Sequence, residues 1–385
     1  MVLILVIIYA VHILHGLKSQ PIISCYFHRE MPPIRYLEEN LCTHYNLIGS
    51  CKIDEHYHIV LPNITTIAKI REWLNGQESP PKLLITFTPV NSRMSYLVKN
   101  NELRKKMIED VTQYLVMNQV NGFDIDWEFP VWGPNAQPTD RKGLSVLIKE
   151  LRERFDQTKS NLLLSMAVAA PFTIADKAYD VNPFNKYLDY VQIMNYDFHM
   201  YSKFQPFTAF NAPLFRKTYE IGIIGKMNSN YSTQHWLERG LWANKTIFGI
   251  PTYGRGYTLF SKYLHSLYAP AIGNAIIGAS YPFVKVCNLT ETKKYKYVFD
   301  AETQSAYIYG SDRQWLGLEN PTTMFSKAKY MKAYNLAGIM IYDLACDDYK
   351  GICKQGTYPL IKAARLAIYN ERKSEEKRID KKLNM

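Results

Sequence analysis

The sequence predicts an α/β protein folded as a closed barrel of eight parallel strands covered by helices. Strand-length apolar runs recur along the chain, and amphipathic helical patterns separate many of them. The strand runs are apolar at nearly every position, which is typical of strands covered on both faces. At 385 residues the chain can hold one such barrel with an insertion. A doubly wound parallel sheet is the alternative.

The predicted elements follow one another in a regular order. The strand runs are residues 21–27, 82–87, 122–129, 162–170, 190–196, 246–253 and 336–342. After the possible caps Thr139 and Asp140, apolar residues at positions 144, 147, 148, 151 and 155 mark one helical face. A second helix, with an apolar face starting at Met107, should stop before Gly122.

One segment breaks the alternation of strand and helix. Residues 257–318 are rich in Tyr and Gly and contain short strand-like pieces such as YKYVFD and SAYIY. We expect a small α+β module inserted into a barrel that occupies residues 20–370. The last residues, 371–385, form a tail of mixed charge.

The N-terminus predicts export from the cell. The chain is apolar from Val2 to Leu14, which is signal-peptide length and too short to span a bilayer comfortably. We expect a signal peptide at residues 1–19 and a secreted, extracellular protein with no stable membrane span; an uncleaved anchor is the alternative. Four N-x-S/T sequons support secretion and predict glycosylation, at Asn63, Asn230, Asn244 and Asn288.

Composition excludes several classes. A hydrophobic fraction of 47% and 29 Tyr are typical of a globular chain and not of a disordered or fibrous one. The net charge of +11 comes from scattered basic residues interleaved with acids, which predicts a solvated basic surface and no nucleic-acid site. Six Cys without paired CxxC spacing predict no zinc site and one to three disulfides. We expect a monomer without a cofactor.

The stretch NGFDIDWEFP, residues 121–130, places acids on one face of a strand. Residues two apart point the same way, so Asp124, Asp126 and Glu128 line the barrel interior. Crowded, desolvated carboxyls split their pKa values, so one can stay protonated as a general acid. An exposed edge strand is one alternative. A magnesium or calcium site is another, but no nearby His or phosphate-binding glycine loop supports it. The opposite face carries Phe123, Ile125, Trp127 and Phe129.

These residues resemble a known signature. GFDIDWEFP resembles the DGxDxDWEYP motif of family 18 glycoside hydrolases, the chitinases and chitinase-like lectins. The resemblance covers most of the chain through five further segments: CYF (25–27), CTH (42–44), MNYDFH (194–199), GIPTYGRGYTL (249–259) and GIMIYDLACDDYKGIC (338–353). It implies a TIM barrel with an α+β insertion between strands seven and eight.

The resemblance also implies a reaction and its residues. The family cleaves β-1,4 bonds between N-acetylglucosamine units with retention, using the substrate's own acetamide as nucleophile. Glu128 would protonate the glycosidic oxygen, Asp126 would orient the acetamide N–H, and Asp124 would share a proton with Asp126. Tyr196 would bind the acetamide oxygen. The implied substrate-binding residues are Tyr26, Met194, Asp197, Tyr253, Arg255, Met340 and Tyr342, and the implied disulfides are Cys25–Cys42 and Cys287–Cys353.

The chain departs from the family pattern at four places. One is near the end of strand two, where an expected aromatic residue appears as Gly49 or its neighbours. Asn121 replaces the first acid of the signature, which removes a charge that could tune Asp124. The third-strand SxGG followed by Trp corresponds to Thr86-Phe87-Thr88-Pro89, and the Trp expected under the reacting sugar is Tyr342. Smaller aromatic platforms predict weaker sugar stacking. The sequence therefore predicts a hydrolase of chitin or chitooligosaccharides, with a chitooligosaccharide-binding lectin as the alternative.

Overall fold

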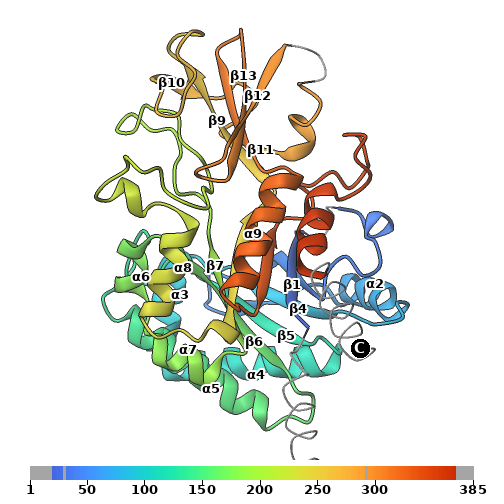
Figure 1. Ribbon diagram of the computed structural model, residues 1–385. Helices are drawn as coiled ribbons and strands as arrows, with labels where there is room; N and C mark the ends of the chain where they lie inside the picture. The colour runs from blue at the N-terminus through green and yellow to red at the C-terminus, as the bar shows by residue number, and fades with distance from the viewer. Residues whose placement is uncertain (1–19, 29–31, 291–293, 370–385) are drawn as a thin grey trace, which may run out of the picture.

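The computed structural model describes residues 20–28, 32–290 and 294–369 (Figure 1). The predicted signal peptide (1–19) and tail (371–385) lie outside the described residues. In the described part, every helix is too short or too polar to cross a membrane.

Eight parallel strands close into a barrel. Their order is β1-β15-β8-β7-β6-β5-β4-β2, and β2 pairs with β1 to complete the ring. This closure confirms the predicted barrel and excludes the doubly wound sheet. A short antiparallel strand, β3 (Ile59–Val60), is attached to β2. The barrel strands are β1 (Ile22–His28), β2 (His44–Ile53), β4 (Lys82–Phe87), β5 (Gly122–Asp126), β6 (Leu163–Ala169), β7 (Tyr190–Met194), β8 (Thr246–Pro251) and β15 (Gly338–Tyr342).

Helices surround the barrel and bury their apolar faces against it (Figure 1). The two helices predicted from the sequence are α5, which begins at Asp140, and α4, which ends at Met117. The helices are α2 (Ile64–Asn75), α3 (Asn91–Lys99), α4 (Asn101–Met117), α5 (Asp140–Asp156), α6 (Phe172–Ala178), α7 (Val181–Tyr187), α8 (Ser229–Glu238), α9 (Pro321–Ala333) and a last helix at residues 359–369. Short 3-10 helices lie at η1 (Ile34–Tyr36), η2 (Ile224–Lys226), η3 (Ala243–Lys245) and η4 (Phe283–Lys285).

The outward face of each strand packs under the helices. In β5, Phe123 and Ile125 are fully buried there, and Trp127 follows them just past the end of the strand. The inward face holds a second, smaller cluster that includes Leu84, Ile247 and Met340. Polar groups share that interior, so the barrel is lined by both apolar and hydrogen-bonding side chains.

An antiparallel sheet is inserted between β8 and β15. It lies beyond one end of the barrel in Figure 1. Where the sequence predicts one strand over residues 246–253, the structure has β8 ending at Pro251 and a new strand starting at Tyr253. The inserted strands are β9 (Tyr253–Leu259), β10 (Ala271–Asn274), β11 (Ser280–Pro282), β12 (Tyr295–Asp300), β13 (Ser305–Gly310) and β14 (Gln314–Leu318).

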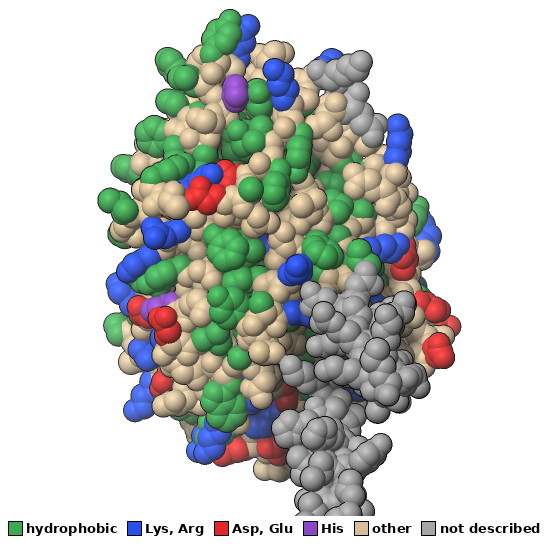
Figure 2. Space-filling model, viewed as in Figure 1, with side chains coloured by type: hydrophobic (Ala, Val, Ile, Leu, Met, Phe, Trp, Pro, Cys, Tyr) green, Lys and Arg blue, Asp and Glu red, His purple; other side chains and the backbone are tan. Residues whose placement is uncertain are grey.

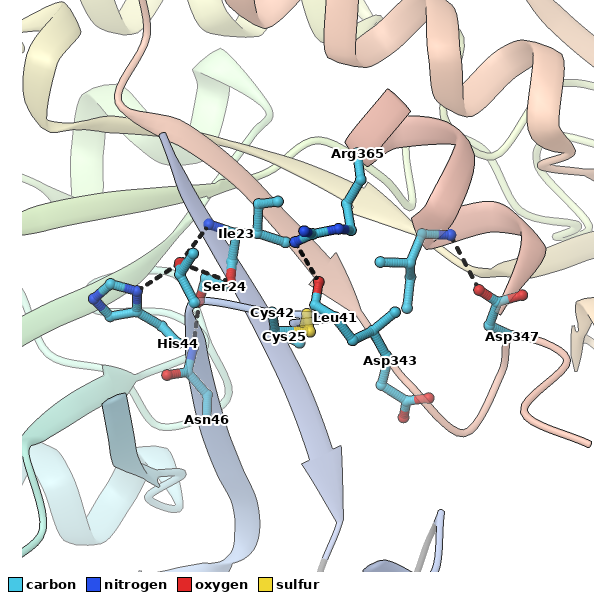
Figure 3. The surroundings of a disulfide bond; sticks show 12 residues. Ile23, Ser24, Cys25, Leu41, Cys42, His44, Asn46, Asp343, Asp347 and Arg365 are labelled. Carbon is cyan, nitrogen blue, oxygen red and sulfur yellow. Dashed lines mark hydrogen bonds between the residues drawn. A yellow bond between two sulfur atoms is a disulfide. The ribbon is translucent and has the colours of Figure 1, made fainter. Parts of the chain in front are cut away.

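Two disulfides cross-link the chain, over 17 and 66 residues of sequence. Cys25 of β1 is bonded to Cys42 (Figure 3), and Cys287 of the insertion is bonded to Cys353. These are the two pairs that the family resemblance implies. Cys51 and Cys346 are free thiols.

The last helix docks beside the first disulfide. Arg365 Nη1 donates to Leu41 O at 3.1 Å, next to Cys42 (Figure 3). The carboxylate of Asp347 accepts hydrogen bonds from the first backbone amides of this helix, Leu360 N and Ile361 N. Such an acidic group at a helix N-terminus satisfies amides that have no partner within the helix.

Candidate functional site

A cavity of about 340 Å³ opens at the carboxyl ends of the barrel strands. This is the end of a TIM barrel where active sites are found. Its wall combines acids, tyrosines and apolar side chains. The lining residues are Tyr26, Asp126, Glu128, Phe129, Ala167, Ala169, Ala170, Pro171, Ile174, Met194, Tyr196, Asp197, Met200, Tyr253 and Tyr342.

Asp124 lies below the cavity and is fully buried. Its Oδ2 accepts from Tyr26 Oη at 2.6 Å and from Thr86 Oγ1 at 3.1 Å, and its Oδ1 accepts from Ser165 Oγ at 2.6 Å and Gln192 Nε2 at 3.0 Å. Burial raises its pKa, and these four hydrogen bonds oppose the rise. Asp124 is therefore held rigidly by four different strands.

Asp126 faces the cavity one step further along the strand. It is nearly buried, and none of the described residues donates a hydrogen bond to its Oδ1. Burial and the nearby Glu128 and Asp124 carboxylates raise its pKa well above the usual value. A buried acceptor without a donor is costly, so this atom is poised for a donor supplied by a ligand.

Glu128 follows the end of β5 and is exposed to the cavity. Partial desolvation by the cavity wall raises its pKa, and the Asp197 carboxylate adds to the rise. Tyr196 lies in the same wall, with its hydroxyl 3.7 Å from the Met340 sulfur. Burial raises the pKa of Tyr196, and the carboxylates of Asp126 and Glu128 contribute. Glu128 and Tyr196 thus face one cavity.

Asp197 is the centre of a second polar group. Its Oδ1 accepts from Tyr253 Oη at 2.7 Å and from Arg255 Nε at 2.6 Å. Its backbone has a φ of +58°, and its amide donates to Asn211 Oδ1 at 3.0 Å, which supports that conformation. Arg255 does not line the cavity; it acts on the wall through Asp197.

Aromatic rings from four barrel strands or the segments that follow them form another part of the wall. Tyr342 packs at ring-centroid distances of 5.6 Å from Tyr26, 5.8 Å from Tyr196 and 6.3 Å from Tyr253. These contacts fix the Tyr342 ring at the cavity floor. Met194 also lines the cavity, and Met340 is fully buried behind Tyr196.

The altered third-strand segment does not block the cavity. Phe87 points outward, is fully buried, and stacks on Phe123 at 5.7 Å between ring centroids. Thr86 points inward to Asp124, and Pro89 is outside the cavity lining. The space above Asp126 is therefore open to a ligand.

Asn121 lies at the opposite end of β5 from the cavity. Its Oδ1 accepts from Leu83 N at 2.8 Å, which ties β5 to β4. The substitution at this position therefore acts on strand pairing, and the described contacts do not place it against Asp124.

Two features of the site differ from the prediction made from the sequence. Phe129 lines the cavity, because β5 ends at Asp126 and the strict alternation of faces ends with it. Gln192, which donates to both Tyr26 Oη (2.7 Å) and Asp124 Oδ1, was missed. A polar residue in the otherwise apolar run YVQIMNY was the available signal.

The four sequons differ in exposure. Asn63 and Asn244 are exposed, with Asn63 Oδ1 capping α2. Asn230 is half-buried and accepts from Tyr330 Oη, and Asn288 donates through Nδ2 to Ile352 O at 3.0 Å. Among the described residues, no group of three or more His, Cys, Asp or Glu side chains could hold a metal ion.

The family model of glycosyl hydrolases family 18 matches residues 22–347. The chain belongs to this family. Mouse chitotriosidase-1 is 30% identical to this family 18 chain over 347 residues, which is 86% of this chain and 73% of the mouse protein.

Solved structures share the fold of this family 18 chain. The group IV chitinase of Ostrinia furnacalis, in complex with allosamidin, has a TM-score of 0.82 and 25% identity, covering 91% of this chain and 99% of that chain. Human YKL-39, a pseudo-chitinase that retains chitooligosaccharide binding, has a TM-score of 0.81 and 24% identity, covering 90% and 99%. The relatives thus include both hydrolases and a binding protein.

Proposed function

We propose that the protein hydrolyses β-1,4 bonds of chitooligosaccharides by substrate-assisted, retaining catalysis. One observation carries this proposal: Asp126, Glu128 and Tyr196 all face a single open cavity, and Asp126 has a buried acceptor to which no described residue donates. The cavity is walled by rings, which suit the flat apolar faces of sugars.

In this scheme Glu128 is the general acid. Its raised pKa favours the protonated carboxyl, which donates its proton to the glycosidic oxygen as the bond from that oxygen to C1 breaks. The substrate's acetamide oxygen bonds to C1 and forms an oxazolinium ion. The Glu128 carboxylate then takes a proton from the water that attacks C1, and the bond from C1 to the acetamide oxygen breaks. This step restores the acid, the acetamide and the original anomeric configuration.

Two further side chains position the acetamide. Asp126 accepts the acetamide N–H through its Oδ1, which fills the vacant acceptor. Tyr196 donates its hydroxyl to the acetamide oxygen, in place of the weak contact with the Met340 sulfur. Holding the internal nucleophile beside C1 lowers the entropic part of the barrier. The hydrogen bonds around Asp124 keep it below Asp126 as a fixed partner; a proton shared between the two stays a prediction.

The structural context supports an extracellular site of action. Two disulfides cross-link the chain, as is usual in an oxidising compartment. The signal peptide and glycosylation remain proposals. Of the sequons, the exposed Asn63 and Asn244 are the best placed to carry a glycan.

The test uses defined N-acetylglucosamine oligomers of three to six units. The secreted chain, Glu128→Gln and Glu153→Gln, an exposed glutamate on α5, are incubated with them, and products are read by mass spectrometry. We expect shorter oligomers from the parent and from Glu153→Gln only. Equal product from Glu128→Gln, or none from the parent, would overturn the proposal.

A binding function is the second candidate. It is favoured by Tyr342, whose ring gives a smaller platform than the expected Trp, and by the chitooligosaccharide binding of YKL-39. Calorimetry, together with the product analysis above, distinguishes a binding protein from a hydrolase. If the parent and Glu128→Gln both bind oligomers and neither hydrolyses them, the protein is a lectin.

A further inference from the structure

Two loops beside the inserted sheet, and strand β10 at the end of one of them, expose large hydrophobic side chains. Phe204 is 97% exposed, Tyr263 is 79% exposed and Phe260 is 65% exposed. Monomeric proteins seldom leave several such side chains together in water without a use for them. We call this group the apolar tip; it consists of Phe204, Phe207, Phe260, Tyr263, Leu264 and Ile272.

Backbone contacts hold the two loops side by side. Ala271 N donates to Pro206 O at 2.8 Å, and Phe207 forms an isolated β-bridge with Pro270. Phe260 N donates to Pro270 O at 2.9 Å. The side chains of the apolar tip are thus presented by one hydrogen-bonded framework rather than by two independent loops.

The segments that carry the apolar tip are poor in acids; Glu220 reaches one of them, by accepting from Tyr268 Oη. Residues 198–219 and 239–290 contain no Asp or Glu. Lys203 and Lys262 are exposed, each beside an aromatic member of the tip, and neither forms an ion pair with the described residues. The nearest turn, 310–313, adds Arg313, while its one acid, Asp312, is bonded to Tyr295 Oη.

We propose that the apolar tip binds the surface of an anionic phospholipid bilayer. Exposed aromatic and aliphatic side chains enter the interface between headgroups and acyl chains, and adjacent lysines pair with the lipid charge. Figure 2 shows hydrophobic side chains with Lys and Arg among them over the upper part of the molecule, where Figure 1 places the inserted sheet. A protein partner of ordinary composition would not explain why residues 198–219 and 239–290 lack Asp and Glu. The positive charge of Lys203 and Lys262 complements the negative charge of the lipid headgroups.

The test is flotation of the full chain with vesicles of phosphatidylcholine and phosphatidylserine at 3:1, and of phosphatidylcholine alone. We expect binding to the anionic vesicles that is at least tenfold weaker for Phe204→Ser/Tyr263→Ser and for Lys203→Glu/Lys262→Glu. The matched control is Ile64→Ser/Met117→Ser, which removes two exposed side chains from barrel helices and should bind like the parent. Circular dichroism verifies that each variant is folded.

Three outcomes would overturn the proposal. The first is that all variants bind both vesicle types equally. The second is that the parent binds no vesicles, while the tip variants lose sedimentable chitin binding. The third is that the parent is a dimer and the tip variants are monomers. Hydrolysis of soluble oligomers should not change in the tip variants, so this test is independent of the proposed activity.

Discussion

The hydroxyl of Tyr26 donates to Asp124 Oδ2 at 2.6 Å and so connects β1 to β5 through the barrel interior. In Tyr26→Phe, one of four donors to a buried carboxylate is lost. We expect the free energy of unfolding to fall by about 1–3 kcal/mol, because the acceptor stays buried. The pKa of Asp124 should rise further, since this hydrogen bond lowers it.

Denaturant unfolding of the Tyr26→Phe variant checks this prediction. Tyr96→Phe, which removes a hydroxyl from an exposed ring, is the control and should leave stability unchanged. Equal stability of the two variants would show that the hydrogen bond to Asp124 adds nothing.

Glu128→Gln keeps the shape of the side chain but cannot donate a carboxyl proton. We expect kcat on a tetramer of N-acetylglucosamine to fall by roughly 10²–10⁴-fold, the usual range for general acid catalysis. Binding of the tetramer, measured by calorimetry, should stay within a few-fold of the parent. A rate loss below tenfold would reject Glu128 as the acid.

Asp197→Asn should change the pH profile of hydrolysis. The Asp197 carboxylate raises the pKa of Glu128, so its loss lowers that pKa. A general acid must be protonated, and the alkaline limb of kcat/KM should therefore move to lower pH in Asp197→Asn. Asp180→Asn, an exposed substitution away from the cavity, should leave the limb in place. A limb that does not move, or moves upward, contradicts the assignment.

The pair of His28 and Asp343 should make stability depend on pH. His28 Nε2 lies 3.2 Å from Asp343 Oδ2, and this hydrogen bond raises the pKa of His28 above 6.5. The stabilisation is fully present below pH 6.5 and is lost as pH rises through the higher pKa of the folded state. His28→Gln should therefore cost up to about 1 kcal/mol at pH 5.5 and less at pH 8.5, measured by urea unfolding. An equal cost at both pH values would contradict this.

Removing the disulfide between Cys25 and Cys42 should destabilise the barrel at β1. The bond closes a loop of 17 residues, which corresponds to about 3 kcal/mol of unfolded-state entropy. We expect Cys25→Ser/Cys42→Ser to lower the free energy of unfolding by about that amount. The control is Cys51→Ser, which replaces a buried thiol that forms no disulfide. Its free energy of unfolding shows how much of the loss comes from replacing a sulfur and not from removing the cross-link.

The elements with strong periodicity could be predicted from the sequence. The apolar spacing after Asp140 gave α5, and the strict alternation through Asp126 placed its carboxyl in the barrel interior. The second barrel strand, β2, was not among the predicted apolar runs, because HYNLIGSCKI mixes polar and apolar residues. Its pairing with β1 and β4 decides its conformation, and pairing is not visible in one sequence.

The candidate site was only partly predictable for the same reason. The positions of the acids follow from the alternation of side chains along a single strand. Gln192 reaches Asp124 from another strand, and the pairing register between strands cannot be predicted from the periodicity of the sequence. The direction of Phe87 was open until the register placed Thr86 opposite Asp124. Contacts across the barrel thus need the closed structure.

Because β1 pairs with both β2 and β15, its neighbours come from residues about 20 and about 315 positions away in the chain. During synthesis, the first described strand must therefore wait with one edge unpaired until the last barrel strand has left the ribosome. Its bond from Cys25 to Cys42 can form early and hold β1 beside β2 during that interval. Ring closure would then be a late step in the folding of the chain, followed by docking of the last helix beside Cys42.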